Sequence, residues 1–112
     1  MLPWNGTIST SLSVIYSPSL NKRGIINNIK FNNTTSEEDW TLSLYQYNPN
    51  TRTSVLLYKR TLPHDESIDD NTSYDLPYGS KLLASSDTQN ISYIINGVEI
   101  NDIKFLKNDS LF

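Results

Sequence analysis

The amino-acid sequence predicts an all-β fold, a single β-sandwich of jelly-roll or immunoglobulin-like character with about seven to eight antiparallel strands. Apolar and polar residues alternate over short segments, turn-forming residues separate these segments, and long helical periods are hard to find. The chain has 112 residues, the size of one domain. We assign residues 7–100 to the sandwich, residues 1–6 to an N-terminal arm and residues 101–112 to a C-terminal tail.

Residues 7–16 predict the first strand, because their larger apolar residues share one parity, with serine and threonine between them. The residues of that parity are Ile8, Leu12, Val14 and Tyr16. Pro18 closes the strand, since proline cannot continue a central strand. Residues 23–32 predict the second strand, and an exposed polar loop follows it.

Residues 40–47 show the cleanest alternation in the chain, with Trp40, Leu42 and Leu44 on one parity. We expect these three side chains in the core. The sequence Asn-Pro-Asn-Thr that follows is a strong turn signal. Residues 53–62, rich in β-forming residues, are therefore expected to return as the second strand of a hairpin.

The remaining segments complete the train of strands. An acidic loop over residues 64–71 leads into a short strand at residues 73–76. A Pro-Tyr-Gly turn separates it from a strand at residues 80–85, and residues 90–100 form the final long strand.

Composition excludes several classes of function. Cysteine is absent, which excludes disulfides, thiolate metal sites and cysteine nucleophiles and fits a reducing cytosol. The net charge of −3 and the scattered basic residues disfavour nucleic acid, because phosphate binding needs a concentrated basic face. We also expect no signal peptide and no membrane span, since no apolar run of the required length is visible.

Five segments form a pattern when they are taken in order. They are Ile26-Asn27-Asn28-Ile29, Asn33-Thr34-Thr35, Leu42-Ser43-Leu44-Tyr45, Gly79 to Ser86, and Tyr93-Ile94-Ile95-Asn96-Gly97-Val98-Glu99. This order and spacing resemble a family of small structural proteins from tailed-phage virions, over residues 7–100. The chain departs from that family at His64-Asp65-Glu66, where a glycine-containing turn is usual, and beyond Ile100, where it extends past the typical end.

The resemblance implies a non-enzymatic protein that is assembled in the host cytoplasm and located in the virion. We expect an auxiliary or decoration protein that stabilises contacts between subunits of the major capsid protein. The alternative roles are a neck or tail adaptor and a fibre-anchoring protein. Association into a homo-oligomer is also an open alternative. We expect no cofactor, no nucleic acid and no membrane partner.

The acidic loop contains the one candidate metal site. Asp65, Glu66, Asp69 and Asp70 are closely spaced, and Ca²⁺ takes about six to eight oxygen ligands. Their spacing does not match an EF-hand loop, so we favour a solvated acidic loop over a metal site. No serine lies in a recognisable nucleophile motif for which His64 could act as a general base. We therefore expect no catalytic residue.

Three tyrosines form a second candidate site. Tyr45 and Tyr47 share one parity of a strand, and Tyr58 lies on its hairpin partner. Residues of one parity share a face, so these rings would form a platform for a sugar or for a partner protein. The favoured alternative is ordinary cross-strand packing. A carbohydrate-binding or host-adhesion module is therefore the second functional hypothesis.

Apolar residues also gather at both ends of the chain, outside the predicted strands. They are Leu2, Pro3, Trp4, Phe105, Leu106, Leu111 and Phe112. Either these ends pack on their own domain or they dock on neighbouring subunits of an assembly, and we favour docking.

Overall fold

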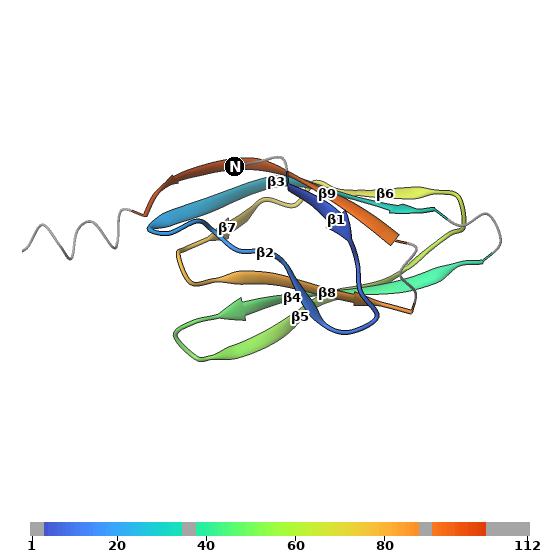
Figure 1. Cartoon of the computed structure of the whole chain (residues 1–112), viewed down its shortest axis with the longest axis horizontal. Coiled ribbons are helices and arrows are strands. Elements are labelled where there is room, and N and C mark those ends of the chain that lie inside the picture. Colours follow the sequence, from blue (N-terminus) through green and yellow to red (C-terminus); the bar gives the residue numbers. More distant parts are fainter. Residues whose placement is uncertain (1–3, 35–37, 88–90, 103–112) are drawn as a thin grey trace, which may run out of the picture.

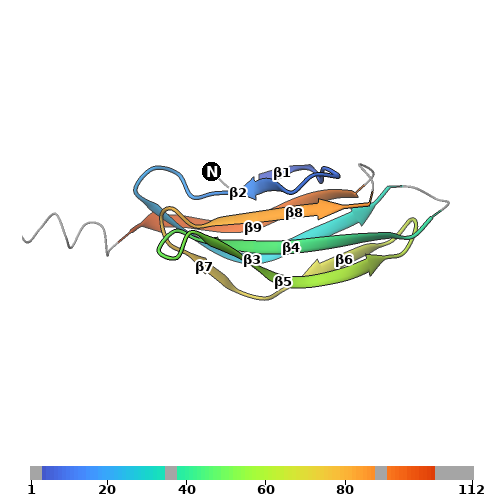
Figure 2. The same cartoon turned by 90° about the horizontal axis from the view of Figure 1, so that it is seen from below.

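The computed structural model describes residues 4–34, 38–87 and 91–102. These residues form nine β-strands and no helix, in two antiparallel sheets that face each other (Figures 1 and 2). The strands are β1 (Trp4–Thr7), β2 (Ser13–Tyr16), β3 (Lys22–Asn33), β4 (Trp40–Asn48), β5 (Thr53–Leu62), β6 (Ser67–Asp70), β7 (Tyr74–Leu76), β8 (Lys81–Ser86) and β9 (Ile91–Asn101). The predicted all-β class is confirmed.

The two sheets are built from interleaved parts of the chain. The five-stranded sheet has the order β1-β9-β3-β6, and β7 also pairs with β3. The four-stranded sheet has the order β2-β8-β4-β5. Every described pair is antiparallel, and only β4 and β5 form a hairpin of consecutive strands within one sheet.

The core lies between the sheets and is built from the inward parity of the central strands. Its fully buried members from β3, β4, β8 and β9 are Ile26, Ile29, Phe31, Leu42, Leu44, Leu82, Ala84, Ile91 and Ile95. Trp40 is partly buried against this cluster. Removing such side chains from water is the main favourable term in folding, at about 25 cal/mol per Å² of apolar area.

One hydrogen bond between the sheets joins Tyr16 on β2 to Glu99 on β9. The Tyr16 hydroxyl donates to Glu99 Oε2 at 2.6 Å, and the Ser19 backbone N–H donates to the same oxygen at 3.3 Å. Burial would raise the pKa of Glu99, but these hydrogen bonds outweigh it and lower the pKa. The Tyr16 ring lies over Gly24, where an added Cβ would come within 2.8 Å of its Cε2 atom. Gly24 therefore leaves the room that this ring needs.

A second hydrogen bond between the sheets joins β5 to β6. The hydroxyls of Tyr58 and Tyr74 both donate to Asp70 Oδ2 at 2.6 Å, and the Thr72 N–H donates to Oδ1 at 2.9 Å. Asp70 is only 7% exposed, and these three donors satisfy its carboxylate. Burial would raise the pKa of Asp70, but the hydrogen bonds lower it overall.

Residues 7–16 do not form one strand, and this prediction was wrong. β1 belongs to the five-stranded sheet and β2 to the four-stranded sheet. The chain crosses between them after Ile8, whose N–H bonds the Ile91 carbonyl at 2.8 Å, and Ser9, whose carbonyl accepts from the Ser86 N–H at 3.1 Å. Ile8 and Tyr16 are buried, whereas Leu12 and Val14, of the same parity, are about half exposed.

The structure also adds strands where the sequence indicated none. The predicted acidic loop contains β6, which pairs with β3 from Ile29↔Asp70 to Asn32↔Ser67. Residues 4–6, assigned to the N-terminal arm, lie in β1 and pair with β9. The total is therefore nine strands rather than seven to eight.

Candidate functional site

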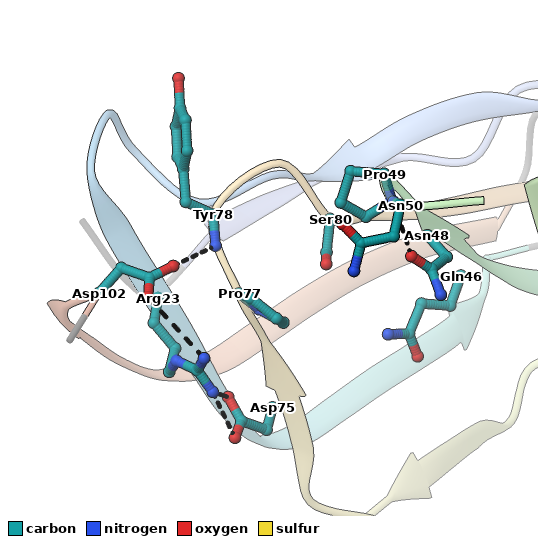
Figure 3. A pocket seen from close by; sticks show the side chains of 10 residues that line it. All are labelled: Arg23, Gln46, Asn48, Pro49, Asn50, Asp75, Pro77, Tyr78, Ser80 and Asp102. Atoms are coloured by element: carbon teal, nitrogen blue, oxygen red, sulfur yellow. Dashed lines mark hydrogen bonds and ion pairs between the residues drawn. The ribbon is translucent and has the colours of Figure 1, made fainter. Parts of the chain in front are cut away.

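A pocket of about 470 Å³ opens at the end of the molecule where the β4–β5 and β7–β8 turns meet (Figure 3). This volume lies in the range of small-molecule sites. The residues that line it come from three strands (β3, β4 and β7), from the two turns, and from the position just after β9. They are Arg23, Gln46, Asn48, Pro49, Asn50, Asp75, Pro77, Tyr78, Ser80 and Asp102.

The charged residues of the pocket, one arginine and two aspartates, lie together along one wall and leave it with a net negative charge. Arg23 Nη1 lies 2.9 Å from both carboxylate oxygens of Asp75, and its Nη2 lies 3.8 Å from Asp102 Oδ1. Asp102 is buried and also accepts a hydrogen bond of 2.9 Å from the Tyr78 N–H. Figure 3 shows the Tyr78 ring directed away from these groups. The Arg23 guanidinium is therefore already engaged in ion pairs with these two aspartates.

The opposite wall offers neutral polar groups. The side chains of Gln46, Asn50 and Ser80 make no hydrogen bond with any other described residue. Ser80 is only 3% exposed, and Figure 3 shows its side chain directed into the pocket beside that of Asn50. Ser80 Oγ is not among the buried polar atoms that lack a partner in the described part of the chain, so this hydroxyl is accessible from the pocket.

A second candidate site is an apolar row across the outer face of the four-stranded sheet. Val14 on β2 pairs with Leu83 on β8, Leu83 with Tyr45 on β4, and Tyr45 with Leu56 on β5. These positions alternate with the buried Leu44 and Ala84, so they face away from the core. Val14 and Leu56 are each 48% exposed. With strands about 4.8 Å apart, the row spans about 14 Å.

Basic residues flank this apolar row on both sides. On one side of the row, Lys59 of β5 pairs with Ser43, which lies two residues before Tyr45 on β4 and on the same face. On the other side, Lys81 of β8 pairs with Tyr47, two residues after Tyr45. The Lys81 ammonium lies 5.3 Å from the centre of the Tyr47 ring. The face thus combines an apolar centre with a basic rim.

The three predicted tyrosines do not share a face. Tyr45 and Tyr47 lie on the outer face, but Tyr58 pairs with the buried Leu44 and bonds Asp70 between the sheets. A β-bulge at Leu57 inserts one residue into β5 and reverses the faces beyond it. The three rings therefore do not form the candidate platform, over which the sequence had already favoured ordinary packing.

The acidic residues of the candidate metal site do not converge. Asp69 pairs with Lys30 on the outer face, whereas the next residue, Asp70, points inward to Tyr58 and Tyr74. Asp65 and Glu66 lie before β6, and Asp65 has a positive φ of 57°. Over the described ranges, no group of three or more acidic or histidine side chains is placed to hold a metal ion.

His64 is paired with an acidic residue, although it lies outside both candidate sites. Its Nδ1 atom and its backbone nitrogen both lie within 3.0 Å of Asp39 Oδ1. The hydrogen bond with Asp39 raises the pKa of His64, and the same contact lowers the pKa of Asp39.

Of the apolar residues predicted to dock at the chain ends, only Trp4 lies within the described part of the chain. It is partly buried against the core, and its ring meets that of Tyr16 edge-on, with centroids 5.3 Å apart. Leu2, Pro3, Phe105, Leu106, Leu111 and Phe112 lie outside the described residues.

Sequence reasoning missed both sites described above. The pocket joins residues from 23 to 102, which no local motif connects. The apolar row joins single outward-facing residues of four strands, and only the register aligns them. The parity of Tyr45 and Tyr47 was the one sequence signal for that face.

Comparison of the chain with protein-family models, with curated proteins and with solved structures gives no match. Among the residues that the structure describes, no helix is long and apolar enough to span a membrane.

Proposed function

We propose that this chain is a non-enzymatic structural protein of a tailed-phage virion, an auxiliary or decoration protein that stabilises the head. The observation that carries the proposal is the outward-facing apolar row Val14, Leu83, Tyr45 and Leu56, whose two end members are each 48% exposed. It crosses all four strands of one sheet and lies between two lysines. A surface of this kind suits contact with another protein.

The order of the strands supports the jelly-roll form of the sandwich. When the strands are lettered B to I along the chain, with β6 and β7 counted together as G, the sheets read B-I-D-G and C-H-E-F. This is the jelly-roll order, which viral capsid proteins share with lectins and cupins. Fold alone does not define function, so the virion assignment also uses the sequence resemblance over residues 7–100.

Stabilisation of a capsid needs contact area rather than chemistry. The apolar row would pack on an apolar strip of the major capsid protein, and Lys59 and Lys81 would meet carboxylates beside that strip. Area does not convert directly into affinity, but a lattice presents the same contact many times.

The test is the copy number of the chain in purified particles, measured by quantitative mass spectrometry against the major capsid protein. A ratio near one, or a simple fraction such as one third, is expected for a protein on the head lattice. About a dozen copies would instead indicate a cyclic ring at the neck or tail and would overturn the decoration role. Absence from the particle would overturn the virion role altogether.

A further inference from the structure

We propose that the pocket between the β4–β5 and β7–β8 turns is a binding site for a neutral carbohydrate. This inference is independent of the virion role and of the apolar row, which lies on the outer face of the four-stranded sheet. It depends on the charge balance of the lining, on the polar groups left without partners, and on the shape of the pocket.

The charge balance argues against an anionic ligand, because the lining holds one guanidinium and two carboxylates. The guanidinium of Arg23 already faces Asp75 at 2.9 Å and Asp102 at 3.8 Å, so it is not available to an anion. The Asp75 carboxylate keeps accepting capacity, because its side chain is 58% exposed. A ligand that donates hydrogen bonds without carrying a charge fits this wall.

The opposite wall presents both donors and acceptors. Each amide of Gln46 and Asn50 has a carbonyl oxygen and an NH₂ group, and the Ser80 hydroxyl both donates and accepts. None of these side chains is bonded to another residue in the described part of the chain. Sugar hydroxyls donate and accept in the same way, so they match these amides and this hydroxyl.

The Ser80 hydroxyl adds a further neutral group to this wall. The residue is only 3% exposed, and its side chain points into the pocket, from which the hydroxyl oxygen is accessible. Its backbone is held by the hydrogen bond of its N–H to the Pro77 carbonyl at 3.0 Å. Ser80 thus presents a fixed hydroxyl at the inner side of the pocket.

Two proline rings provide apolar surface beside these polar groups. Pro77 and Pro49 line the pocket from the two turns, and Pro49 also lies next to Gly79, which has a φ of +96°. Rigid rings lose little entropy on binding, and they suit the C–H faces of a sugar ring. The pocket therefore combines a pre-formed shape with neutral hydrogen-bonding groups.

The experiment is a titration of the ¹⁵N-labelled full chain with glucose, galactose, mannose and N-acetylglucosamine, followed by NMR. Glucuronate serves as an anionic comparison. At least one neutral sugar is expected to shift the backbone signals of residues 46–50 and 75–80. Gln46→Ala and Asn50→Ala are each expected to weaken that binding about fivefold, as the loss of one hydrogen bond predicts.

Asn27→Ala is the matched control, because Asn27 is an exposed asparagine of β3 outside the pocket lining. It should leave the affinity unchanged. Three results would overturn the inference: no shift with any neutral sugar at millimolar concentration, shifts confined to the face of Tyr45 and Tyr47, or tighter binding of glucuronate than of every neutral sugar. Copy number in the particle is unaffected by these variants, so failure here leaves the virion proposal standing.

Discussion

The Tyr58 hydroxyl donates a 2.6 Å hydrogen bond to Asp70 and so connects the edge strand of one sheet to a strand of the other. Tyr16 and Glu99 make an equivalent contact, also 2.6 Å long, between β2 and β9. The two sheets are therefore joined by a tyrosine–carboxylate pair at two separate places as well as by the apolar core.

Tyr58→Phe is expected to destabilise the protein by about 1–2 kcal/mol, because it removes a hydrogen bond to a buried carboxylate. The loss is limited because Tyr74 and Thr72 still donate to Asp70. Chemical denaturation monitored by circular dichroism measures the effect. Tyr47→Phe, on the outer face, is the control and should change stability by less than about 0.5 kcal/mol. Equal effects of the two variants would contradict a special role for the Tyr58 hydroxyl.

The Asp70 carboxylate should contribute to acid sensitivity. Its pKa in the folded protein is below the ordinary value of 3.8, so its contribution is present above that value and is lost as pH falls through the folded pKa. Asp70→Asn should therefore be less stable at neutral pH and lose less stability on acidification. Unfolding free energies across the acid range compare the two proteins. Parallel pH profiles would show that the carboxylate is not linked to folding.

Gly24→Ala is expected to cost about 1–3 kcal/mol, because the new methyl group would enter the space of the Tyr16 ring. Displacement of that ring would also weaken its hydrogen bond to Glu99. A double-mutant cycle with Tyr16→Leu tests the cause by thermal and chemical unfolding. The cost of Gly24→Ala should shrink when the large ring is absent. Additive costs would locate the strain elsewhere.

Leu56→Glu is expected to leave folding stability within about 0.5 kcal/mol, since Leu56 is exposed on the outer face. Under the proposed virion role it should strongly reduce incorporation into particles, because a carboxylate would interrupt the apolar row. Quantitative mass spectrometry of purified particles provides the readout. Asn27→Glu, with the same added charge on the other sheet, should incorporate normally. Normal incorporation of Leu56→Glu would exclude this row as the contact surface.

His64 should titrate above its ordinary pKa of 6.5, because its ring bonds Asp39. The charged histidine is favoured in the folded protein, so any stabilisation from this contact is present at low pH and is lost as pH rises through the folded pKa. NMR titration of the ring protons measures the midpoint. Asp39→Asn should lower it, and an unchanged midpoint would show that the contact does not persist in solution.

Local alternation was sufficient to predict the hairpin of β4 and β5, the long strand β3 and the final strand β9. In each case the strand lies in one sheet, and the alternation on either side of a bulge is long enough to show a strand. Residues 7–16 failed because Ile8 and Tyr16 keep a common parity although the chain changes sheets between them. Parity records which residues are buried, but it does not record which sheet buries them.

Two further predictions, for β6 and for Tyr58, failed because of contacts and register that local sequence does not show. β6 was expected to be a loop because it contains Asp69 and Asp70, but tyrosines of β5 and β7 satisfy the inward Asp70. Tyr58 would have paired with Ser43 on the outer face in an uninterrupted hairpin, and the bulge at Leu57 turns it inward. Neither event leaves a local sequence signal.

The bulge at Leu57 also affects how copies of this chain meet one another. β5 forms an edge of its sheet, and a long, flat edge invites another strand to add to it. Here the bulge interrupts the regular spacing, and the exposed Lys59 and Arg60 place two positive charges beyond it. Both features disfavour the addition of a strand from another copy to this edge.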